Sequence, residues 1–133
     1  MYEAGCAVEF RSFHVMPGLP PPEGERHSHD YRLEVVASRE DLDDRGMVVD
    51  LDVLDGGLRA LADRLDGADL DQVIAPQMGT DAVTVEVFAR WAHSRLAETV
   101  GPLGGTTLAV RLWESTTAFG GYTAALDGRS SSA

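Results

Sequence analysis

Polar and apolar residues alternate along two segments near the N-terminus, as they do in β-strands with two unlike faces. The first strand is expected over residues 5–15, and the second over residues 27–38. One face of the first strand carries Val8, Phe10, Ser12 and His14. One face of the second strand carries His27, His29, Tyr31, Leu33 and Val35. The residues between them, 16–25, include four prolines and two glycines and are therefore expected to form a loop.

A helix is predicted next, because apolar residues recur every three or four positions up to Leu65. Its apolar stripe consists of Leu54, Leu58, Leu61, Ala62 and Leu65. Either Asp50 or Asp52 is a suitable N-cap. Residues 46–50 before the helix are interpreted as a short strand, and residues 67–81 after it as a long acidic loop.

A second helix is predicted over residues 84–99, and Gly101-Pro102 ends it. Its core stripe consists of Val85, Phe88, Ala89, Ala92 and Leu96. Trp91 lies off this stripe and is a candidate for packing on a neighbouring subunit, whereas His93 lies at the stripe's edge and is interpreted as structural. Strands over 106–114 and 119–125 follow and are expected to form a hairpin.

The predicted order of elements is β-β-α-α-β-β, which indicates an α+β domain. We expect a four-stranded antiparallel sheet with two helices on one face. A chain of 133 residues fits one domain, which we assign to residues 1–126. Residues 127–133 are expected to form a short polar tail.

The charged residues exclude several kinds of function. The formal net charge is −11, and all 11 basic residues are arginine. Without lysine there is no Schiff-base or P-loop lysine chemistry. The acidity argues against nucleic-acid partners and anionic membranes. No stretch approaches the about 20 apolar residues that a membrane-spanning helix needs. The lack of a signal-peptide pattern and the single cysteine, Cys6, predict a cytoplasmic protein.

Three of the four histidines are placed where they could form one metal site. His27 and His29 point to the same side of a strand, because strand side chains alternate with period two. His14 on a neighbouring strand could supply a third nitrogen. Three imidazoles with an open fourth position are typical of catalytic zinc, and such an ion can polarise a carbonyl group.

Several motifs in order give the chain a resemblance to the 6-pyruvoyl-tetrahydropterin synthase family, which includes 6-carboxytetrahydropterin synthase and has the T-fold. The similarity covers about residues 8–122. The motifs are Phe10-x-x-x-His14, His27-x-His29-x-Tyr31, Gly46-Met47-Val48-Val49-Asp50-Leu51, Leu65-Asp66, Thr84-Val85-Glu86 with Ala89-Arg90-Trp91, and Glu114. The resemblance implies Zn²⁺ on His14, His27 and His29. It also implies substrate binding by Glu114, which anchors a pterin ring in the family, and by Thr84 and Glu86.

The chain departs from the family pattern where acid–base groups are expected. The family's catalytic cysteine precedes the H-x-H pair, but no cysteine lies there, and Glu23 or Glu25 is a candidate replacement base. The histidine of the family's L-D-H motif is replaced by Gly67, so Asp66 lacks the partner it would orient. Asp66 remains a third candidate for catalysis.

Three functions are therefore compatible with the sequence. The first is a divergent zinc-dependent enzyme with lyase or tautomerase chemistry on a small hydroxylated or carbonyl substrate. The second is an authentic synthase that makes 6-carboxy- or 6-pyruvoyl-tetrahydropterin from dihydroneopterin triphosphate. The third is a non-catalytic zinc or pterin binder. The resemblance further implies a homohexamer with its sites at subunit interfaces.

Overall fold

Four strands and four helices make up the computed structural model, which describes residues 1–126. The predicted tail, 127–133, lies outside the described residues. The strands are β1 (Tyr2–His14), β2 (His27–Arg39), β3 (Thr106–Trp113) and β4 (Phe119–Ala125). The helices are α1 (Leu51–Leu65), α2 (Leu70–Val73), α3 (Ala75–Met78) and α4 (Val85–Val100). All four helices follow β2 and precede β3, which confirms the predicted α+β order.

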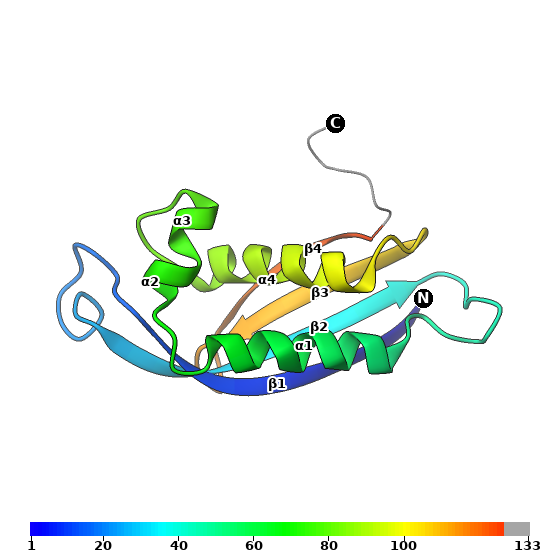
Figure 1. The fold of residues 1–133 in the computed structure, drawn as a ribbon, viewed down its shortest axis with the longest axis horizontal. Coiled ribbons are helices and arrows are strands. Elements are labelled where there is room, and N and C mark those ends of the chain that lie inside the picture. The colour runs from blue at the N-terminus through cyan, green and yellow to red at the C-terminus, as the bar shows by residue number, and fades with distance from the viewer. Residues whose placement is uncertain (127–133) are drawn as a thin grey trace.

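The strands form one antiparallel sheet in the order β1-β2-β3-β4, and the helices lie on one of its faces (Figure 1). Helix α1 packs mainly on β1, and α4 packs on β3 and β4. The apolar core lies between these two layers. Leu33, Val35, Leu58 and Phe88 have no exposed surface there. The buried face of β1 and β2 is therefore the one that the alternation pattern identified.

Side-chain caps fix where the two long helices begin. The carboxylate of Asp50 accepts hydrogen bonds from the backbone N–H groups of Asp52 and Val53, at 3.0 and 3.3 Å. Thr84 caps α4 in the same way, because its hydroxyl accepts from the N–H of Val87 at 3.2 Å. Such caps satisfy N–H groups that have no partner within the helix. Both predicted helices are thus confirmed, with Asp50 as the cap of the first.

The short strand predicted over residues 46–50 is wrong, because these residues form bends and irregular backbone after a turn at residues 44–45. The carboxylate of Asp43 accepts from the N–H groups of Arg45 and Met47, at 2.9 Å each. Val48 and Val49 are only 6% and 5% exposed. They are apolar because this irregular segment packs against the core, not because it forms a strand.

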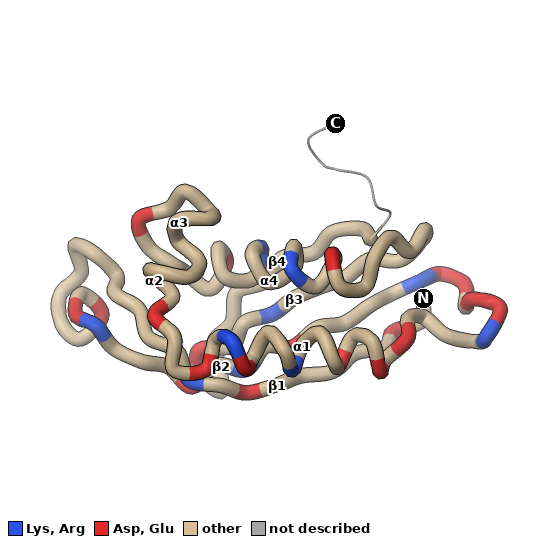
Figure 2. Tube along the Cα trace, in the orientation of Figure 1, with Lys and Arg blue, Asp and Glu red and all other residues tan. Residues whose placement is uncertain are grey.

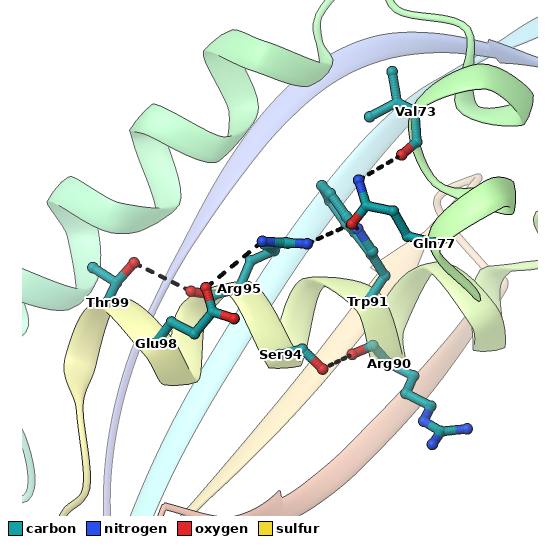
Figure 3. A network of polar contacts seen from close by, with 8 residues as sticks. All are labelled: Val73, Gln77, Arg90, Trp91, Ser94, Arg95, Glu98 and Thr99. Atoms are coloured by element: carbon teal, nitrogen blue, oxygen red, sulfur yellow. Dashed lines mark hydrogen bonds and ion pairs between the residues drawn. The ribbon is translucent and has the colours of Figure 1, made fainter.

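The loop predicted over residues 67–81 is also wrong in part, because it contains α2 and α3. These two short helices lie over one end of α4 (Figure 1) and change the surroundings of Trp91. Trp91 is only 2% exposed, so its predicted role on the outside of the subunit is wrong. Its indole N–H donates to Oε1 of Gln77 in α3 at 2.9 Å, and Arg95 donates to the same oxygen (Figure 3).

Within residues 1–126, none of the helices is both long and apolar enough to cross a membrane. The charged positions are spread along α1 and over the loops that follow β1 and β2 (Figure 2).

Candidate metal centre

The three histidines converge where β1 ends and β2 begins. The strand register places His14 opposite His27 and Ser12 opposite His29. His14, His27 and His29 share one face of the sheet, so their rings lie close together. The ring centroids are 4.5 Å apart for His14 and His27, 5.1 Å for His14 and His29, and 4.8 Å for His27 and His29. One nitrogen from each ring lies within 4.8 Å of the others. The predicted three-histidine cluster is therefore present and could hold a metal ion.

Backbone carbonyl groups orient two of these rings. Nδ1 of His14 lies 3.0 Å from the carbonyl oxygen of Val83, and Nδ1 of His27 lies 2.7 Å from that of Glu25. A carbonyl oxygen only accepts, so each Nδ1 carries the proton and each Nε2 presents a lone pair. This is the arrangement in which metal-binding histidines are usually held.

Among residues 1–126, the Nε2 atoms of the three histidines have no partner outside the cluster. Nε2 of His14 is buried without a hydrogen-bond partner, and Nε2 of His27 lies 3.1 Å from Nε2 of His29. A buried nitrogen without a partner is costly. A divalent cation accepting all three lone pairs would remove that cost, so the residues present fit a metal ion.

Burial favours the neutral form of two of the imidazoles, those of His14 and His29. Burial lowers the pKa of His14, and burial followed by the charge of His14 lowers the pKa of His29. A neutral imidazole is the form that coordinates a metal. Tyr31 packs against this cluster, with its ring centroid 5.5 Å from that of His29. Burial and then the charge of Glu114 raise the pKa of Tyr31 well above its usual value, so its hydroxyl keeps its proton.

The predicted substrate-binding residues approach the same end of the sheet. Glu114 follows directly after β3, is half-buried, and lies close enough to His14, His29 and Tyr31 to shift their pKa values. Thr84 and Glu86 stand at the start of α4, beside the Val83 carbonyl that orients His14. The Thr84 hydroxyl is used in capping, and Glu86 is exposed.

The three candidate bases occupy different surroundings. Glu23 is exposed in the loop between β1 and β2, and its charge raises the pKa of His29 against the effect of burial. Glu25 is also exposed, and its backbone carbonyl is engaged with His27. Asp66 is tied to β1, because its Oδ1 accepts from the backbone N–H of Arg11 at 3.0 Å.

One acidic residue near the cluster was missed by sequence analysis. Asp71 in α2 is half-buried, and its Oδ2 accepts from the backbone N–H of Val15 at 2.8 Å. Its negative charge raises the pKa of His14 and of Tyr31. Nothing in the sequence marks it, because Asp71 lies in a segment expected to be an acidic loop.

A cavity of about 930 Å³ lies next to the cluster, mainly on the helix-free face of the sheet. Its charged lining residues are Glu9, Arg11, Asp30, Arg32, Glu34 and Glu114. Trp113 also lines it, and of the three histidines only His29 does. The metal centre thus stands at the rim of this cavity rather than inside it.

The fold and the cluster together define an α+β protein with a candidate three-histidine metal centre at one end of its sheet. Residues 6–125 match the family model described as 6-pyruvoyl tetrahydropterin synthase, so the chain belongs to that family. This confirms the resemblance inferred from the motifs. A search of curated proteins gives no match.

Solved structures of the family share the fold at low sequence identity. The 6-pyruvoyl tetrahydropterin synthase of Caenorhabditis elegans matches with a TM-score of 0.71 and 19% identity, covering 93% of this chain and 96% of the other. The enzyme of Plasmodium vivax matches with a TM-score of 0.69 and 12% identity, covering 94% and 99%. An uncharacterised protein of Wolinella succinogenes matches with a TM-score of 0.68 and 17% identity, covering 91% and 97%. These likenesses establish the T-fold.

Proposed function

We propose that the chain is a zinc-dependent enzyme with a divergent active site, which performs lyase or tautomerase chemistry on a small hydroxylated or carbonyl substrate. The observation that carries this proposal is that one ring nitrogen from each of the three histidines lies within 4.8 Å of the others, and that backbone carbonyls orient two of the rings through Nδ1. His14, His27 and His29 would hold Zn²⁺. When bound, the ion polarises a carbonyl oxygen of the substrate.

Glu114 is proposed as the residue that anchors the substrate. Its carboxylate has two acceptor oxygens, which suit a pair of N–H donors on a guanidine-like edge. The charge of Glu114 acts on Tyr31, and both residues line the cavity that His29 also lines. Thr84 and Glu86 at the start of α4 would contact the substrate through the backbone or through the Glu86 carboxylate.

Glu23 is the best-placed general base. Its carboxylate is exposed and not engaged in an ion pair within the described chain, yet its charge partly opposes the burial that lowers the pKa of His29. Two variants of the Plasmodium vivax enzyme replace a catalytic glutamate with alanine or cysteine, which supports a glutamate in this role. Asp66 is a weaker candidate, because its carboxylate already accepts the Arg11 N–H group, and Glu25 remains an alternative to Glu23.

Two other functions remain as alternatives. Glu114 favours an authentic 6-carboxy- or 6-pyruvoyl-tetrahydropterin synthase with Glu23 as base. The absence of lysine and the glycine at position 67 favour the divergent enzyme instead. The missing Cys and His of the family pattern would also suit a non-catalytic zinc or pterin binder.

We further propose that residues 1–126 act as a single cytoplasmic domain that assembles into a homohexamer. Strands β1 and β4 are the two edges of the sheet. Edges with unpaired backbone groups favour pairing with other chains. The metal centre stands at the rim of a cavity, and another copy could close it there. A monomer in light scattering would contradict this assembly.

The test combines metal analysis with turnover. Purified protein should bind one Zn²⁺ per chain, His27→Ala should abolish that binding, and His93→Gln, outside the cluster, should leave it intact. Absence of stoichiometric metal from the wild type would sink the proposal. Zinc-loaded protein is then incubated with dihydroneopterin triphosphate, and the products are identified by mass.

Pterin products that are lost in Glu23→Gln would identify an authentic synthase. No product from this substrate, but turnover of other hydroxylated or carbonyl compounds that is lost in Glu23→Gln, would support the divergent enzyme. Binding of pterin by calorimetry without any turnover would favour the binder.

A further inference from the structure

Asp71 is an acidic side chain with one satisfied and one unsatisfied oxygen. Its Oδ2 accepts from the backbone N–H of Val15, the residue that follows His14. Its Oδ1 is fully covered and has no hydrogen-bond partner. Leaving a carboxylate oxygen buried without a partner is costly. The group therefore requires either a functional explanation or a structural one.

Helix capping and ion pairing do not explain Asp71, because other residues fill these roles. Asp69 caps α2, because its carboxylate accepts from the N–H of Asp71 at 3.3 Å. Arg26, which precedes β2, pairs with Asp69 at 3.3 Å. No ion pair of Asp71 is present among the described residues. Helix α2 has only four residues, so its dipole gives little reason for a second acid in its first turn.

The Asp71 carboxylate lies near the candidate metal centre, since it contacts Val15 next to His14 and its charge acts on His14. Nε2 of His14 and Oδ1 of Asp71 are both buried atoms without a partner. The charge of Asp71 acts on His14 and on Tyr31. One carboxylate thus accepts a hydrogen bond from the main chain next to a candidate ligand and places a negative charge near the imidazole of that ligand, His14.

We propose that Asp71 is a positioning residue of the metal centre. Its Oδ2 fixes the main chain after His14, and its partly buried charge favours a divalent cation on His14, His27 and His29. The inference rests on the proposed function only in requiring that the three histidines bind a metal. It adds a residue from α2 to a site otherwise built from β1 and β2.

The test uses Asp71→Asn, because asparagine keeps an oxygen that accepts from Val15 but removes the charge. Asp69→Asn is the matched control. It removes the same charge two residues away, and asparagine is an equally good N-cap. The dissociation constant for Zn²⁺ is measured by chelator competition at fixed pH for wild type and both variants. Groups that support metal ligands are worth about 10- to 100-fold in affinity.

We expect Asp71→Asn to weaken Zn²⁺ binding at least about tenfold and Asp69→Asn to change it less than about twofold. The visible spectrum of bound Co²⁺ should be the same in all three proteins, since the ligands are unchanged. Affinity of Asp71→Asn within twofold of wild type, or an equal loss in Asp69→Asn, would overturn the inference. Failure of the wild type to bind Zn²⁺ would instead count against the proposed function.

A second pair of variants covers the case in which Asp71→Asn does not fold. Asp71→Glu keeps the charge, and Asp71→Gln has the same length without it. The glutamate variant should bind Zn²⁺ at least about tenfold more tightly than the glutamine variant. Equal affinities would show that the charge has no part in holding the metal.

Discussion

Gly120 allows β4 to pass directly against the first turn of α4. A Cβ atom added there would lie 2.5 Å from Cγ2 of Val85 and 3.0 Å from the backbone nitrogen of Glu86. Both distances are shorter than the roughly 3.5 Å of an ordinary contact. The Val85 methyl group can rotate away, but the Glu86 nitrogen moves only with the helix. Gly120→Ala therefore pushes the start of α4 away from the sheet, together with the Val83 carbonyl that orients His14.

The expected loss of stability follows from two opposing effects. Overpacking of this kind costs about 1–3 kcal/mol. Gly120 does not have a positive φ, so alanine recovers about 0.4–1 kcal/mol through the unfolded state. We expect a net loss of about 1–2 kcal/mol. With an unfolding entropy of about 2.1 cal/mol/K per residue over 133 residues, each kcal/mol lowers Tm by about 3.6 °C. Tm should therefore fall by about 4–7 °C.

Differential scanning calorimetry at one pH measures the change. Gly104→Ala is the control, because no atom of the described residues lies within 4 Å of its added Cβ, and its Tm should rise by about 1–4 °C rather than fall. Adding Val85→Ala to Gly120→Ala should restore only part of the loss, since the contact with Glu86 remains. A Gly120→Ala protein whose Tm equals that of the wild type would refute the close approach of β4 and α4.

Three further predictions concern parts of the chain outside the metal centre. Gly56→Ala in α1 should raise the free energy of unfolding by about 0.5–1 kcal/mol in urea titrations, because its Cβ meets open space; no gain would contradict this. Gln77→Met should lower it by about 1–3 kcal/mol, because the buried Trp91 N–H loses its acceptor; an unchanged urea midpoint would count against this role of the hydrogen bond. Burial lowers the pKa of His93, so the unfolded chain binds the proton first as pH falls below about 6.5, and stability declines there. His93→Gln should therefore lose less stability than wild type between about pH 7.5 and 5.5, and equal losses would exclude His93 as a cause.

The sequence predicted the metal cluster well because the required information is local. Period-two alternation places His27 and His29 on one face, and the same pattern places His14 on the buried face of β1. A hairpin-like antiparallel pair brings the end of one strand next to the start of the other. This proximity does not depend on the conformation of the loop between the two strands. The convergence of the three rings follows from these facts alone.

What the sequence could not predict depends on short elements and on contacts between distant segments. Helices α2 and α3 have four residues each, far below the about 11 to 18 residues over which periodicity is legible. Once they were interpreted as a loop, nothing remained to cover Trp91, and it was assigned to the surface. Asp71 was missed for the same reason, because its contact with Val15 spans 56 positions along the chain.

The stretch from Asp66 to Asp71 occupies the outer edge of β1 at the end nearest the histidines. Main-chain bonds join Gly67 to Arg11 and Ala68 to Phe13, at 2.7 and 2.9 Å, in parallel fashion. On the outer edge of the 13-residue β1 strand, only the N-terminal part therefore remains available for pairing with another strand. The opposite edge of the sheet is the 7-residue strand β4. Strand addition is ambiguous in register when an edge is long and uniform. Here residues 66–71 cover one end of the β1 edge, so a strand from another chain can pair with β1 in only a few registers. The segment that carries Asp71 thereby also limits which strands can pair there.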